Sequence, residues 1–192
     1  MKPPDWNAVV EELITAAKGA IKDFAEAHPD ETVSYFGFDA NPPYGSVLIS
    51  IDTLDNSIRA AKEISKRFLQ TWRPKAKANW SSHYLLSMTH SQATPFFSML
   101  GDFSYMGYRE LEFPEWQQYI QTTEPDEANP RADSPEQYIE AQASRAMFLA
   151  LDSLVKTRTL QMLRLSERCC VGFATHDSPQ TITTHVLNWP DP

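Results

Sequence analysis

The stretch Tyr35–Thr53, with the sequence YFGFDANPPYGSVLISIDT, decides the fold of this chain. Two runs rich in β-branched, aromatic and other apolar residues flank the segment Asn41–Gly45. Such runs favour strands, and Pro, Asn and Gly favour a turn between them. The stretch therefore predicts a β-hairpin with strands near Val33–Phe38 and Ser46–Asp52. Both runs are apolar on two faces in places, which predicts a sheet covered on both sides.

A helix is predicted before the hairpin. Apolar residues between Trp6 and Phe24 recur at helical spacing, and Asp5 is placed to accept hydrogen bonds from the first turn. Pro29 disfavours helical geometry at the residue before it. The helix should therefore end near Ala27.

A second helix is predicted after the hairpin, capped by Thr53 or Asp55 and running to about Trp72. Three basic residues lie roughly a third of a turn from its apolar side, namely Arg59, Lys62 and Lys66. This basic flank is a candidate anion-binding site. The alternative is a solvated face that contributes only charge.

The middle of the chain is aromatic and punctuated by glycine. One strand is predicted around Trp80–Met88 and another around Phe103–Gly107. Phe113–Trp116, with the sequence FPEW, opens a short helix that runs to about Gln121, because proline is favoured at the first helical position.

A long helix is predicted to begin at Ser134–Gln137, where serine caps, proline takes the first position and glutamine completes a capping box. Leu151 lies on its apolar face. Phe148 and Leu149 lie off that face, which predicts that the helix is covered on more than one side. The helix should break near Thr157–Thr159.

Two further elements are predicted toward the carboxyl end. Cys169–Ala174 predicts a buried final strand, with one cysteine facing each side. Ser178-Pro179 repeats the helix-start pattern, and Ile182 and Val186 would pack behind that helix. Together these patterns predict a single α+β domain over residues 1–192. Its central, mostly antiparallel sheet includes the N-terminal hairpin and is packed by amphipathic helices.

The bulk composition limits the class of protein. Of 192 residues, 42% are apolar, which is typical of a folded chain. No apolar run is long enough to span a membrane, and the first residues lack the apolar core of a signal peptide. These features predict a cytoplasmic protein. The oligomeric state is left open.

The charge of the chain selects among partners. The formal net charge of −8 argues against nucleic acid and against anionic membranes, and it suits a basic protein partner. Residues 81–144 carry ten acidic and two basic residues, so the acidity is concentrated there.

We expect no catalytic residue, cofactor or metal site from the motifs. The five histidines form no HExxH pattern, and no nucleophile elbow or phosphate loop occurs. Cys169 and Cys170 lie in an apolar run, where burial disfavours a reactive thiolate. Asp39 and Asp52 should lie at opposite ends of the hairpin strands, too far apart for a shared acid–base site.

A candidate partner-binding surface lies in the acidic, aromatic segment between Tyr105 and Trp116. Aromatic anchors supply affinity and acidic residues steer a basic partner. Its predicted members are Tyr105, Tyr108, Glu110, Glu112, Glu115 and Trp116. The alternative is ordinary surface charge.

The YFGFDA hairpin and the FPEW element, followed by a Ser-Pro-capped helix, resemble a family of bacterial domains of unknown function. The resemblance covers nearly the whole chain and implies a bacterial α+β domain. It assigns no catalytic residues.

Two classes of function stay open at this point. The first is a non-enzymatic protein-binding domain, such as an immunity or antitoxin-like factor whose acidic surface binds a basic partner. The second is an enzyme or small-molecule sensor with a pocket near the aromatic segment and the basic helix flank.

Overall fold

The predicted hairpin forms the middle of the fold. Strand β1 (Val33–Asn41) pairs antiparallel with β2 (Ser46–Thr53), with Phe38 opposite Ile49. The short helix η1 (Pro42–Tyr44) and Gly45 connect the two strands. Gly45 has a φ of 62°, and a side chain there would collide with the backbone oxygen of Phe113, so only glycine fits this turn. The computed structural model describes residues 2–60, 62–63, 103–123, 134–175 and 181–188.

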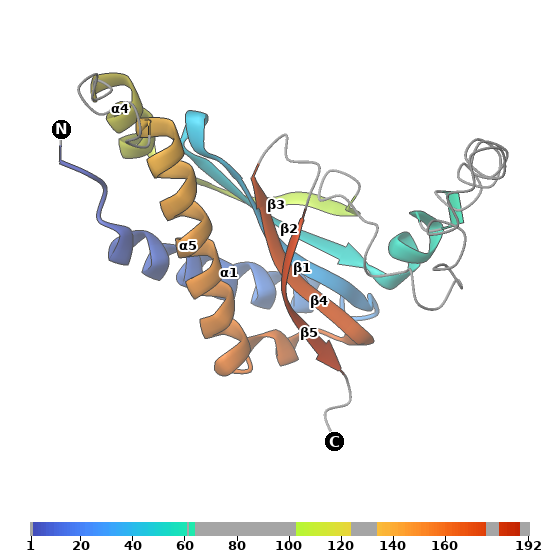
Figure 1. Ribbon diagram of the computed structural model, residues 1–192. Helices are drawn as coiled ribbons and strands as arrows, with labels where there is room; N and C mark the ends of the chain where they lie inside the picture. Colours follow the sequence, from blue (N-terminus) through green and yellow to red (C-terminus); the bar gives the residue numbers. More distant parts are fainter. Residues whose placement is uncertain (1, 61, 64–102, 124–133, 176–180, 189–192) are drawn as a thin grey trace, which may run out of the picture.

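The hairpin belongs to a five-stranded sheet with the order β3-β2-β1-β4-β5 (Figure 1). Strand β4 (Leu165–Thr175) runs parallel to β1, and every other pair is antiparallel. The edge strands of the described sheet are β3 (Tyr105–Glu112) and β5 (Ile182–Asn188). The predicted mostly antiparallel sheet is thus confirmed.

Strand β5 corrects one prediction. The Ser178-Pro179 pattern predicted a helix with Ile182 and Val186 behind it, but residues 182–188 form a strand paired with β4. The sequence ITTHVLN is rich in β-branched residues, which fit a pleated edge better than a helix. Cys169–Ala174 is therefore a strand, as predicted, but it is not the last one.

Helices α1 (Trp6–Ala27) and α5 (Pro135–Lys156) pack on one face of the sheet (Figure 1). Both predicted caps are present. Asp5 accepts from the backbone N–H groups of Asn7 and Ala8, and Ser134 and Gln137 form the capping box. The short helix α4 (Pro114–Thr122) precedes α5, and η4 (Thr159–Met162) follows it, where the predicted break occurs.

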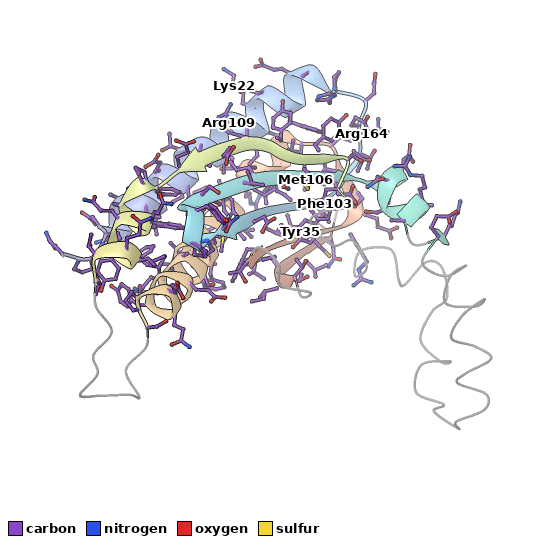
Figure 2. All side chains as sticks on the ribbon, turned by 90° about the horizontal axis from the view of Figure 1, so that it is seen from above. Lys22, Tyr35, Phe103, Met106, Arg109 and Arg164 are labelled. Atoms are coloured by element: carbon purple, nitrogen blue, oxygen red, sulfur yellow. The ribbon has the colours of Figure 1, made fainter. Side chains whose placement is uncertain are left out.

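The main core lies between this helical layer and the sheet. Phe36, Phe38 and Ile49 point into it from the hairpin, and Leu151 of α5 is fully buried there, as predicted. On the opposite face Tyr35 packs against Phe103, with ring centroids 4.8 Å apart (Figure 2). The central strands are therefore buried on both faces.

Two differences concern helices. Phe148 and Leu149 are 43% and 39% exposed, so the prediction that α5 is covered on more than one side is wrong for them. After β2, residues 54–60 are helical and the Thr53 hydroxyl accepts from the Asn56 N–H, as predicted. The predicted end of that helix at Trp72 and the strand at Trp80–Met88 lie outside the described residues. None of the described helices is long and apolar enough to cross a membrane.

Candidate functional site

Strand β3 carries four of the six residues predicted to bind a partner, and its backbone is irregular. Arg109 lies opposite Ile49 and Tyr105 opposite Ile51, so three residues of β3 face a single residue of β2. Gly107, with a φ of 62°, stands in this bulge and donates its N–H to the Ser50 hydroxyl at 3.1 Å. Bulges of this kind reset the alternation of side chains along a strand.

Because of the bulge, Tyr105 and Tyr108 both lie toward α1. They pack edge-on against Phe24, with ring centroids 5.0 and 5.5 Å away, and they also contact His28. The Tyr105 hydroxyl lies 3.3 Å from His28 Nδ1 and donates to Glu31 Oε1 at 3.3 Å. Partial burial and the Glu31 carboxylate raise the pKa of Tyr105. The two tyrosines are therefore half-buried contacts inside the fold.

Arg109 also lies toward α1 (Figure 2). Its guanidinium donates to the Ala16 carbonyl at 3.1 Å and forms an ion pair with Asp23. It lies so close to Gly19 that a Cβ at that position would collide with Nη1. The absence of a side chain at Gly19 thus makes room for the arginine, and the only cation of β3 is neutralised on the helical face.

Glu110 and Glu112 lie on the other face of β3. Leu111 between them is buried in the core, so its neighbours point the opposite way. They lie opposite Leu48 and Ser46, and both are exposed. Glu110 and Glu112 are therefore exposed together on one face of β3, and the two tyrosines lie on the other side of the strand.

Trp116 is a correction. The sequence placed it among exposed aromatic anchors, but it is fully buried and stacks on Phe113 with ring centroids 4.6 Å apart. The first turn of α4 presents alternate sides to core and solvent, and the indole takes the core side against Trp6. Glu115, the neighbouring residue, is half-buried in that first turn, where a carboxylate interacts favourably with the helix dipole.

Asp52, at the end of β2, is the centre of a buried polar network that the sequence patterns did not predict. The side chain is fully buried. Its carboxylate accepts from the Ser57 hydroxyl at 2.5 Å, the Asn56 side chain at 2.7 Å and the Ser104 N–H at 3.2 Å. A carboxyl group buried without hydrogen-bond donors would be costly, and these donors compensate for the loss of water around Asp52. Asp39 lies four residues further along β1 from the position opposite Asp52, so the two carboxylates are separate, as predicted.

The basic flank is only partly described. Arg59 is exposed and donates to the Asn56 side-chain oxygen at 2.5 Å, which attaches it to the Asp52 network. Lys62 is exposed, and Lys66 lies outside the described residues. The Arg59 contact gives this cation a structural partner, and the anion site stays a prediction.

Other reactive groups are placed for packing. Cys169 and Cys170 are free and buried on opposite faces of β4, as predicted, and burial raises the pKa of both thiols. Within the described ranges, no group of His, Cys, Asp and Glu side chains is arranged to hold a metal ion. A shallow groove of about 700 Å³ is lined by residues 2–7 and Glu115, and no residue of the basic flank lines it.

Comparison with known proteins adds no assignment, because no protein-family model, curated protein or solved structure matches this chain. The resemblance to a bacterial family of unknown function therefore stays a prediction.

Proposed function

We propose that this chain is a non-enzymatic protein-binding domain, of the immunity or antitoxin-like kind, that takes a basic protein partner on its acidic surface. One observation carries the proposal. On β3 the single cation, Arg109, is paired with Asp23 toward α1, whereas Glu110 and Glu112 are exposed on the opposite face. Within the described part of the chain, this separation leaves Glu110 and Glu112 without a cationic partner, and such a negative face would steer a cationic protein and raise its association rate.

The rival function has less support. A pocket between the aromatic segment and the basic flank would serve an enzyme or a sensor. The groove lined by residues 2–7 and Glu115 includes no residue of the basic flank, and Tyr105 and Tyr108 are engaged with Phe24 and His28. The free, buried Cys169 and Cys170 suit a reducing compartment, and a cytoplasmic location is part of the proposal.

The test is selection of random ten-residue peptides from a display library on the immobilised protein. Enrichment of Lys and Arg on the wild type, lost on the Glu110→Lys/Glu112→Lys variant, would support the proposal. Added salt should weaken binding, because at an ionic strength of 0.1 M the attraction between exposed charges falls off over a distance of about 10 Å. The matched control is Glu11→Lys/Glu12→Lys, which makes the same charge change on exposed positions of α1. The proposal would be contradicted if the selected peptides carried no excess of basic residues. It would also be contradicted if those peptides bound equally to the Glu110→Lys/Glu112→Lys variant and to the Glu11→Lys/Glu12→Lys control.

A further inference from the structure

The backbone of β3 has a defined outward side. The Phe113 N–H donates to the Gly45 carbonyl, and the antiparallel register continues from this pair through Leu111 opposite Val47 and Arg109 opposite Ile49. In an antiparallel pair, the residues that bond to the partner strand recur at every second position. Leu111 and Arg109 therefore turn their backbone N–H and C=O groups toward β2. Glu110 and Glu112 turn theirs away from the described strands of the sheet.

The outward backbone groups and the exposed carboxylates thus belong to the same two residues. A strand added antiparallel beside β3 would form its backbone hydrogen bonds with Glu110 and Glu112. The residues of that strand directly opposite them would place their side chains on the same face as the carboxylates, about 5 Å away between Cβ atoms. Because Glu110 and Glu112 are two positions apart, the complementary side chains on the added strand also recur at every second residue.

The opposite edge does not offer this combination. Strand β5 has the sequence ITTHVLN, which contains no Asp, Glu, Lys or Arg. A cationic strand would find backbone groups there but no carboxylate on the strand. The charge pattern therefore selects β3 for a basic segment.

We propose that β3 binds an extended basic segment by strand addition, with Lys or Arg at alternate positions opposite Glu110 and Glu112. This inference rests on the proposed basic partner and adds its binding mode. Backbone hydrogen bonds would give affinity that depends little on sequence, and the alternating cations would give register. Four regular positions, 109–112, follow the bulge, so a short segment suffices.

The probe is the blocked peptide Thr-Lys-Val-Lys-Val-Lys-Thr, with binding measured by calorimetry or fluorescence anisotropy on the full chain. Two further peptides carry N-methyl groups on the backbone nitrogens of either the lysines or the valines. In the proposed register the lysine N–H groups point to β3 and the valine N–H groups point to solvent. We expect lysine N-methylation to weaken binding about tenfold or more and valine N-methylation to have a much smaller effect.

Two outcomes separate this inference from the proposed function. Equal effects of the two N-methylations, with binding still lost in Glu110→Gln/Glu112→Gln, would overturn strand addition and leave an acidic docking surface. Binding that is the same for Glu110→Gln/Glu112→Gln and for the control Glu11→Gln/Glu12→Gln would overturn both. Support requires the difference between the two methylated peptides and its disappearance in the Glu110→Gln/Glu112→Gln variant.

Discussion

The edge strands of the described sheet, β3 and β5, both carry features that limit uncontrolled pairing with other strands, but they use different residues. Each is interrupted by a bulge. On β3 it spans residues 106–108, and on β5 the register leaves Thr184 between His185 opposite Val171 and Thr183 opposite Gly172. The bulge on β3 is tied down by Gly107 and Ser50, and the one on β5 by the Thr184 hydroxyl, which donates to the Val171 carbonyl at 3.0 Å.

The edges differ in how charge is distributed. On β3, Arg109 and the two tyrosines lie toward α1, whereas Glu110 and Glu112 are exposed on the opposite face of the strand. On β5 the only titratable side chain is that of His185. Its Nε2 lies 3.5 Å from Asp152 of α5, and its ring stacks on Phe148. Bulges and charges both limit uncontrolled pairing of edge strands. Of the two edges, β3 is therefore the one where pairing with another strand would be selective for charge.

The largest expected effect is at Asp52, which holds Ser104 directly before β3. Asp52→Ala leaves the donors of Ser57, Asn56 and Ser104 without their acceptor, so we expect a loss of about 3 kcal/mol in unfolding free energy. Urea unfolding measures this loss. Hydrogen exchange should accelerate more in β3 than in β5.

Asp55→Ala is the control for that prediction, because Asp55 is exposed at the start of the same helix. Its cost should stay below about 1 kcal/mol. Similar losses for the two variants, or equal acceleration of exchange at the two edges, would show that the network does not anchor β3.

The next largest effect tests the contact between Arg109 and α1. Alanine in place of glycine within a helix ordinarily stabilises by about 1 kcal/mol. Gly19→Ala should give less than this gain in the wild type, because the new Cβ displaces the guanidinium from Ala16 and Asp23. In an Arg109→Ala background the same change should regain about 1 kcal/mol. Thermal or urea melts of the four proteins complete the cycle, and additivity would contradict the contact.

The smallest effect concerns the β5 edge. The hydrogen bond from Lys156, together with His185, lowers the pKa of Asp152. A carboxyl whose folded pKa is depressed stabilises the fold above its ordinary pKa, and that contribution is lost as the pH falls through the lower folded value. Lys156→Met should therefore raise the pKa of Asp152, measured by NMR titration of the carboxyl carbon. The exposed Lys18→Met variant should not, and an unchanged Asp152 would rule out the pair.

Much of the fold could be predicted because its signals are local. The hairpin, the Asp5 cap, the Ser134–Gln137 capping box and the FPEW helix start each depend on residues within a few positions of one another. Local patterns also misled at Ser178-Pro179, where the β-branched run that follows forms β5.

The site was harder to predict because it depends on contacts distant in sequence. The bulge at Gly107 places Tyr105 and Tyr108 on one face, although their spacing predicts opposite faces in a regular strand. The burial of Trp116 depends on Trp6 and Phe113 together. The Asp52 network joins Ser104 across more than fifty residues. The acidic residues Glu110 and Glu112 were predictable because alternation around an apolar Leu111 already places them together.

The most direct test of the central claim compares the two edges in one NMR titration with the alternating lysine peptide. We expect the backbone amides of Glu110 and Glu112 to shift and to gain protection from hydrogen exchange, because their outward N–H groups acquire acceptors. The amides of Leu111, Val186 and Asn188 should gain no protection. Protection that appears on β5, or shifts on β3 without any gain in protection, would contradict a basic strand bound at the β3 edge.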